Sequence, residues 1–137
     1  MAVIYTATVH STNGREGHIR SSDAVLDLDT RKPVEGGTAA GTNPEQLFAA
    51  AYGACYGGSL KFVADKQRID LPPDWSVDAD VSMNLEGGGV YLSAVLTVNL
   101  PSMEPEKANR LAQTAHGACP YSKAVKGNID VRVEVVV

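Results

Sequence analysis

Alternating apolar and polar positions along the chain indicate several short β-strands, each with one buried face. The strictest alternation covers residues 76–85. One face of this segment carries Val77, Ala79, Val81 and Met83. A turn at Glu86-Gly87-Gly88-Gly89 follows, and residues 90–100 return as a second strand, so a β-hairpin is predicted here. Further strands are expected at residues 3–10, 18–21, 24–28 and 129–137, with a tight turn at Asn13-Gly14.

One long segment lacks this alternation and is predicted to be a helix that begins after Asn43. Asn43 is a favourable N-cap, and Pro44 suits the first helical position because the N–H that it lacks has no partner there. The helix dipole favours Glu45, and Gln46 is placed to complete a capping box. Residues 47–65 are mostly apolar, and their polar side chains come late, so we expect a largely buried helix.

Three glycines interrupt this helix around Cys55, namely Gly53, Gly57 and Gly58. Each costs about 1 kcal/mol relative to alanine in a helix interior. Such a cost indicates close packing, or the close approach of a ligand, around the cysteine.

The C-terminal part of the chain adds two more helices. Residues 105–118 are predicted to form an amphipathic helix, and residues 120–126 a shorter one that ends at Gly127. The apolar face of the first consists of Ala108, Leu111, Ala112 and Ala115. A glycine-rich loop, residues 35–42, leads from the first strands to the long helix. This order of elements predicts an α+β fold in a single domain over residues 1–137.

Composition and charge exclude several classes of function. The chain has 137 residues, 44% of them apolar, and a net charge of −4, whereas nucleic-acid binding needs a basic surface. No segment approaches the roughly 18 consecutive apolar residues of a membrane span. The first residues, Met1 to Thr6, lack the basic and apolar regions of a signal peptide. We therefore expect a soluble cytoplasmic protein that binds neither nucleic acid nor membrane.

The two cysteines are the main candidates for chemistry, because cytosolic thiols are kept reduced and seldom form permanent disulfides. Cys55 lies in the middle of the long helix, where a free cysteine is most often a small buried hydrophobe. Cys119 directly precedes Pro120. If Pro120 begins the next helix, its free amides and the helix dipole stabilise a Cys119 thiolate. His116 would help if protonated, although a histidine that only packs or faces solvent is the commoner case.

Other chemical motifs are absent from the sequence. Because 64 positions separate the two cysteines, they form no C-x-x-C redox motif. With three scattered histidines they also form no recognisable set of metal ligands. The sequence contains no phosphate-binding or dinucleotide-binding motif, so neither a metal nor an organic cofactor is expected.

Arg15 and Glu45 are candidates to assist a reactive cysteine. An arginine near a thiol lowers its pKa, and a carboxylate can hold the guanidinium by two parallel hydrogen bonds. Each also has an ordinary explanation, Arg15 as an exposed turn residue and Glu45 as a favourable charge in the first helical turn. Ten residues separate Glu45 from Cys55, or about 15 Å along a straight helix. Either the helix is broken between them, or the long Arg15 side chain bridges them.

Two segments resemble the cysteine motifs of a known family. Residues 43–55, NPEQLFAAAYGAC, resemble the first motif of the organic hydroperoxide resistance proteins, which share a superfamily with the osmotically inducible protein C. Residues 115–129, AHGACPYSKAVKGNI, resemble the second. The similarity covers the whole chain and includes Gly14-Arg15-Glu16-Gly17. Lys126 stands where the family pattern has arginine, which leaves the shape of the pocket and the substrate preference open.

The resemblance implies a fold, an activity and a set of residues. The implied fold is OsmC-like, with a long central buried helix, antiparallel β-sheets and an intertwined homodimer in which both chains build each active site. Cys55 would attack organic hydroperoxides, including those of fatty acids, and Cys119 would form a disulfide with the resulting sulfenic acid. Arg15 would stabilise the Cys55 thiolate, and Glu45 would hold Arg15. The implied reductant is a lipoyl dithiol, on dihydrolipoamide or a lipoylated protein, in a response to oxidative stress.

Two other functions fit the same residues. A non-catalytic module would bind a lipid-like ligand in the apolar surroundings of Cys55, while the cysteines only pack. A redox sensor would oxidise once to the same disulfide and signal to a partner. The presence of both cysteines together with Arg15 and Glu45 favours the peroxidase.

Overall fold

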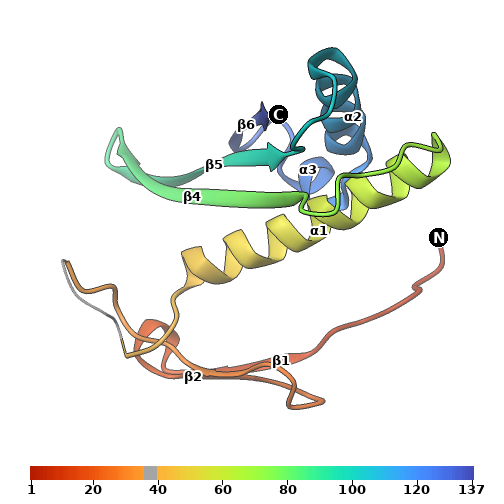
Figure 1. Ribbon diagram of the computed structural model, residues 1–137. Helices are drawn as coiled ribbons and strands as arrows, with labels where there is room; N and C mark the ends of the chain where they lie inside the picture. Colours follow the sequence, from red (N-terminus) through yellow and green to blue (C-terminus); the bar gives the residue numbers. More distant parts are fainter. Residues whose placement is uncertain (36–39) are drawn as a thin grey trace. The chain divides into compact units, whose positions relative to one another are not determined.

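The computed structural model describes residues 1–35 and 40–137 (Figure 1). The chain divides into two compact units, Met1–Leu47 and Phe48–Val137. The expected glycine-rich loop, residues 35–42, lies partly outside the described residues, and the single domain stays a prediction. Among the described residues, no helix has the length and apolar character to cross a membrane.

The first unit is built on a three-stranded antiparallel sheet in the order β1–β2–β3. Its strands are β1 (Val9–Thr12), β2 (His18–Ser21) and β3 (Asp27–Asp29), and the short 3-10 helix η1 (Gly14–Glu16) lies between the first two. Asn13 and Gly14 have positive φ angles of 52° and 55°, which confirms the predicted turn. β2 covers the predicted residues.

Two predicted strands of this unit differ from those observed. The first was expected over residues 3–10, but β1 pairs with only the four residues of β2, and an extended segment becomes a strand only where its backbone groups find partners. The third was expected from Ala24, yet Ala24 has a positive φ of 62° and belongs to the turn. Ser21 closes this turn by donating its amide to the Leu26 carbonyl at 2.8 Å.

The second unit combines helices with a three-stranded sheet in the order β4–β5–β6. Its strands are β4 (Ser76–Glu86), β5 (Gly89–Asn99) and β6 (Asp130–Val136), and its helices are most of α1 (Pro44–Lys66), α2 (Pro105–Ala118) and α3 (Pro120–Val125). These elements confirm the predicted hairpin, helices and last strand. The antiparallel arrangement holds for β4 and β5, whereas β6 runs parallel to β5 because α2 and α3 supply the crossover connection that parallel strands need.

The core of the second unit lies between its helices and one face of this sheet (Figure 1). Its largest fully buried side chains are Tyr52, Tyr56, Leu60, Leu96, Leu100, Leu111 and Val98. The predicted apolar face of α2 is confirmed, since all four of its residues are buried. Met83, which was predicted to share the face of Val77, is exposed instead, because the core contacts on β4 end at Val81. Cys119 has no exposed surface, whereas Cys55 packs at the edge of the core.

The start of α1 follows the predicted capping pattern in part. The Asn43 side chain accepts a hydrogen bond from the Gln46 amide at 2.9 Å, which confirms the N-cap. The Gln46 side chain does not close the capping box, because its carbonyl oxygen accepts from the Thr42 hydroxyl at 2.9 Å. This end of the helix is therefore held by residues on both sides of the cap.

The glycines around Cys55 are not forced by close packing. A methyl group at Gly53 or Gly57 would lie 3.6 Å from Ala79 or Trp75, which is ordinary van der Waals contact, and at Gly58 it would meet nothing. Packing within the described residues therefore does not require glycine at these positions, and the close approach of a ligand around Cys55 stays a prediction.

Candidate active site

The two cysteines lie side by side in the second unit, although 64 positions separate them in the sequence. The Cys119 Sγ is 3.8 Å from the Cys55 Sγ, and both are free thiols. A disulfide bond measures about 2.05 Å, so the sulfurs need to approach by roughly 1.8 Å to form one. The pair is arranged for reversible disulfide chemistry.

Local backbone preferences place the Cys119 sulfur. Cys119 is the single residue between α2 and α3, with extended φ and ψ angles of −66° and 123°. Proline disfavours the helical conformation in the residue that precedes it, so Pro120 ends α2 here and begins α3, as predicted. The Cys119 amide still donates to the Ala115 carbonyl at 2.9 Å, which keeps the residue attached to α2.

The electrostatics of the thiols differ from the sequence-based expectation. That expectation assigned the free amides at the start of α3 to Cys119, but the Cys119 side chain does not cap this helix. Burial raises the pKa of Cys55, and this outweighs the Tyr121 backbone N–H, which donates to the Cys55 sulfur and lowers its pKa. Contact with Cys119 raises the pKa of Cys55 further. Within the second unit, the raised pKa favours the protonated thiol of Cys55, and a positive charge nearby would favour its thiolate.

Three aromatic side chains cluster on and beside this part of α1. The rings of Phe48 and Tyr52 meet edge to face at 6.2 Å between centroids, and the rings of Tyr52 and Tyr121 are 5.9 Å apart. Tyr121 also supplies the amide that reaches Cys55. Apolar surroundings of this kind suit a substrate with an alkyl group.

Arg15 and Glu45 form a bidentate ion pair in the first unit. The Arg15 Nη1 donates to Glu45 Oε2 at 2.9 Å, and Nη2 donates to Oε1 at 2.7 Å. The hydrogen bonds from Arg15 hold the pKa of Glu45 below its usual range. The carboxylate therefore stays ionised throughout the neutral range and loses the guanidinium only when the pH falls through this lowered pKa.

A break in the helix between Glu45 and Cys55 is excluded, since α1 runs without interruption over Pro44–Lys66. The ion pair belongs to the first unit and the cysteine pair to the second. The bridging role of Arg15 therefore stays a prediction.

Sequence reasoning named His116 but missed the hydrogen bonds that link it to the buried Ser122 and Tyr52 beside the cysteines. The Ser122 hydroxyl lies 2.8 Å from the Tyr52 hydroxyl and 2.8 Å from His116 Nδ1. The available signal was the spacing, because each of the three residues lies three positions from a cysteine. Within residues 1–35 and 40–137, no cluster of histidine, cysteine and acidic side chains is suited to bind a metal ion.

The fold and the sequence define the class of protein. Residues 36–134 match the family described as OsmC-like protein, which covers the long helix, both of the later helices and most of the second sheet. The chain is thus an OsmC-like protein, and its α+β architecture is the one that the resemblance implied.

Similar proteins define its branch of that class. Organic hydroperoxide resistance protein OhrB of Bacillus subtilis (strain 168) is 44% identical over 135 residues, which cover 96% of this chain and 98% of that protein. The crystal structure of Bacillus subtilis OhrB has a TM-score of 0.88 at 45% identity, covering 98% of this chain and 100% of the other. A Vibrio cholerae protein of the same description, with captopril in one of its active sites, has a TM-score of 0.89 at 40% identity, covering 98% and 94%. The chain belongs to the organic hydroperoxide resistance proteins.

Proposed function

We propose that this protein is a cysteine-based peroxidase that reduces organic hydroperoxides, including those of fatty acids, to alcohols. The observation that carries the proposal is the pair of free thiols 3.8 Å apart, with Cys55 partly exposed and Cys119 buried. Relatives named for organic hydroperoxide resistance support the substrate class. The aromatic residues around Cys55 support a preference for alkyl hydroperoxides over hydrogen peroxide.

In the first step, the Cys55 thiolate attacks the distal oxygen of the hydroperoxide. A sulfur–oxygen bond forms as the oxygen–oxygen bond breaks, so that the sulfur is oxidised to a sulfenic acid and the peroxide is reduced. The alkoxide leaves and takes up a proton to become the alcohol.

In the second step, the Cys119 thiol attacks the sulfenic sulfur of Cys55. The disulfide bond forms while the sulfur–oxygen bond of Cys55 and the sulfur–hydrogen bond of Cys119 break, and one water molecule leaves. A lipoyl dithiol, on dihydrolipoamide or a lipoylated protein, then reduces the disulfide by exchange and becomes a cyclic disulfide itself.

Arg15 supplies the positive charge that the Cys55 thiolate lacks in this proposal. Support comes from the burial that raises the pKa of Cys55 and from Glu45, which fixes the guanidinium of Arg15. The working unit is an intertwined cytoplasmic homodimer of single-domain chains, so Arg15 comes from the same chain or from its partner.

Thiol titration tests the function directly. We expect one equivalent of tert-butyl hydroperoxide to remove both free thiols of the reduced protein, because Cys55 oxidises and Cys119 then closes the disulfide. Dihydrolipoamide should restore both thiols and sustain turnover. A non-catalytic lipid-binding module would keep both thiols, and that result would reject the peroxidase. A redox sensor would lose both thiols but cycle slowly with dihydrolipoamide.

Replacing Arg15 with alanine is expected to raise the pKa of Cys55. Loss of a neighbouring cation shifts a thiol by about one pKa unit, so alkylation at neutral pH should slow about tenfold. The measurement is the pH profile of alkylation in a Cys119→Ser background, in which only Cys55 reacts. Arg20→Ala removes an exposed arginine of the same unit and should leave the profile unchanged. The assignment fails if Arg15→Ala leaves it unchanged too.

A further inference from the structure

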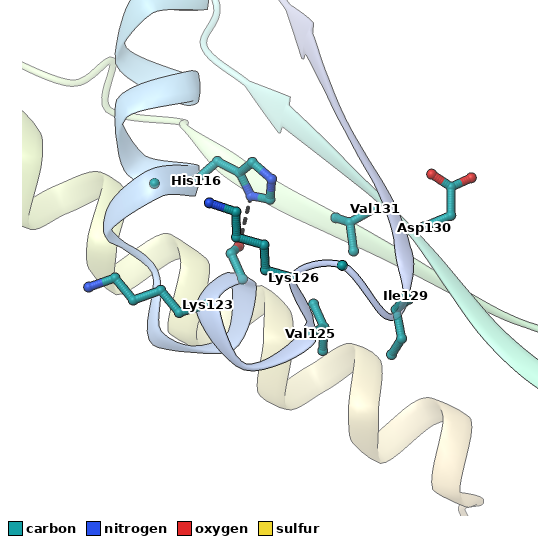
Figure 2. Close-up of a pocket in the computed structure, with 10 residues that line it drawn as sticks. His116, Lys123, Val125, Lys126, Ile129, Asp130 and Val131 are labelled. Carbon is teal, nitrogen blue, oxygen red and sulfur yellow. Dashed lines mark hydrogen bonds between the residues drawn. The ribbon is translucent and has the colours of Figure 1, made fainter.

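A chain of hydrogen bonds connects the three helices that meet at the cysteines. The Ser122 hydroxyl lies 2.8 Å from the Tyr52 hydroxyl on α1 and 2.8 Å from His116 Nδ1 on α2. Tyr52 and Ser122 are buried. Figure 2 shows the hydrogen bond of His116 at the wall of a pocket of about 460 Å³, which Lys123 and Lys126 also line. The polar chain therefore leads from the core to a pocket at the surface.

Each of the three hydrogen-bonded residues lies three positions from one of the two cysteines in the sequence. Tyr52 precedes Cys55 by three residues on α1, so it lies one turn earlier. His116 precedes Cys119 by three residues, at the end of α2, and Ser122 follows it by three, in α3. Ser122 thereby ties both helices that flank Cys119 to the helix that carries Cys55.

Ser122 is the central residue of these hydrogen bonds, because it is bonded to both Tyr52 and His116. A serine hydroxyl has one proton to donate and two lone pairs that accept, so it can link two partners by accepting from both or by donating to one and accepting from the other. Ser122 is the only hydrogen-bond partner of the Tyr52 hydroxyl in the part of the chain that the structure describes. Without Ser122, this buried hydroxyl would lose a hydrogen bond that water cannot easily replace.

Tyr52 also lies close enough to the two cysteines for a charge on either sulfur to change its pKa. Burial raises the pKa of Tyr52, and negative charge on Cys119 or Cys55 raises it further. Tyr52 therefore stays a neutral phenol during the reaction cycle, and its hydroxyl remains available to hold Ser122.

We propose that Tyr52, Ser122 and His116 are positioning residues that hold Cys119 against Cys55 for the disulfide-forming step. The proposal rests on the proposed peroxidase function and assigns these residues to its second step. Cys119 is a single residue between two helices, so a shift of either helix moves its sulfur. The sulfurs are 3.8 Å apart and need to approach by roughly 1.8 Å, so a small displacement matters.

Speed in this step has a chemical consequence. A sulfenic acid that waits for its partner is exposed to a second hydroperoxide molecule, which oxidises it irreversibly to a sulfinic acid. Holding the thiol in a reactive position makes closure effectively intramolecular and lets it compete with that second oxidation. The polar chain thus protects Cys55 from inactivation without contacting the hydroperoxide.

Ser122→Ala and Tyr52→Phe test this role. Each reduced protein is mixed rapidly with one equivalent of tert-butyl hydroperoxide, and oxidation of Cys55 is timed separately from disulfide formation. We expect the first step at the wild-type rate and closure slowed about tenfold, which corresponds to about 1.4 kcal/mol of barrier. With excess hydroperoxide, the sulfinic fraction of Cys55 should rise in the same variants.

Conservative variants and a matched control separate positioning from general loosening of the fold. Ser122→Thr keeps the hydroxyl and His116→Asn keeps a polar atom near Nδ1, so both variants should keep most of the wild-type closure rate. Ser59→Ala removes a serine hydroxyl that donates to the Cys55 carbonyl, within α1, and should leave closure unchanged.

Two results would overturn the proposal: closure at the wild-type rate in both Ser122→Ala and Tyr52→Phe, or equal slowing of both steps, which indicates loosening of the whole unit. Wild-type protein that keeps both thiols under hydroperoxide would refute the peroxidase itself, and the positioning role with it. Failure of the positioning role alone is distinguishable, because the wild-type protein then still closes its disulfide.

Discussion

Cys55→Ser is expected to abolish the reduction of organic hydroperoxides. A serine hydroxyl is a weak nucleophile at neutral pH unless a base activates it, and it can form neither a sulfenic acid nor a disulfide. Steady-state turnover of tert-butyl hydroperoxide with dihydrolipoamide should therefore fall at least about 1,000-fold, or about 4 kcal/mol of barrier. The variant should fold normally, because serine is close to cysteine in size and Cys55 is partly exposed.

Cys119→Ser provides the control for this experiment, since it keeps the proposed nucleophile and should still consume at least about one equivalent of hydroperoxide. In Cys55→Ser, the remaining thiol of Cys119 should stay reduced after the same treatment, because its full burial shields it from the hydroperoxide, and it should be titratable once the protein is denatured. Turnover in Cys55→Ser above about a tenth of the wild-type rate, a loss of less than about 1.4 kcal/mol, would show that another group attacks the peroxide.

The second large effect is expected in Cys119→Ser, where Cys55 should become overoxidised. With no thiol 3.8 Å away, the Cys55 sulfenic acid persists and reacts with further hydroperoxide to give the sulfinic acid. After excess tert-butyl hydroperoxide without a reductant, intact-protein mass spectrometry should find two added oxygens on most molecules. Steady-state turnover should fall at least about tenfold, because the sulfinic acid is not reduced by dithiols.

The wild-type protein and the double variant Cys55→Ser/Cys119→Ser complete that experiment. The wild type should instead lose two hydrogens as its disulfide forms, and the double variant should gain no oxygen at either position. If Cys119→Ser gains no oxygen either, Cys119 does not resolve the sulfenic acid, and the 3.8 Å contact is only packing.

Elements whose signals are local were predicted well from the sequence. Asn43 and Pro44 mark the start of α1 because a cap needs only the first turn of the helix that it begins. The hairpin β4–β5 was predicted from the glycines at its turn, and Gly87 and Gly88 adopt the positive φ angles that a tight turn requires. Predictions failed where a partner segment decides the outcome, as for β1, which extends only as far as β2 can pair with it.

The family motifs, rather than any periodicity, paired Cys55 with Cys119 and Arg15 with Glu45. Physical reasoning on the sequence treated each cysteine separately, since each interpretation depended on nearby residues. It therefore gave the amides of α3 to Cys119, the adjacent residue, although the Tyr121 amide donates to Cys55. The hydrogen bond from Tyr121 to Cys55 was not foreseen because the direction of a helix end depends on how it packs against a distant helix.

The two cysteines show which features the sequence determined and which depended on the tertiary structure. The sequence by itself shows that the two cysteines do not belong to one short redox motif. Its local pattern also places Cys119 between two helices, directly before Pro120. Only tertiary packing brings the sulfurs within 3.8 Å of each other and joins Tyr52, Ser122 and His116 by hydrogen bonds. The physical reason is that local signals act over a few residues, whereas contacts across 64 positions exist only once α1, α2 and α3 share one core.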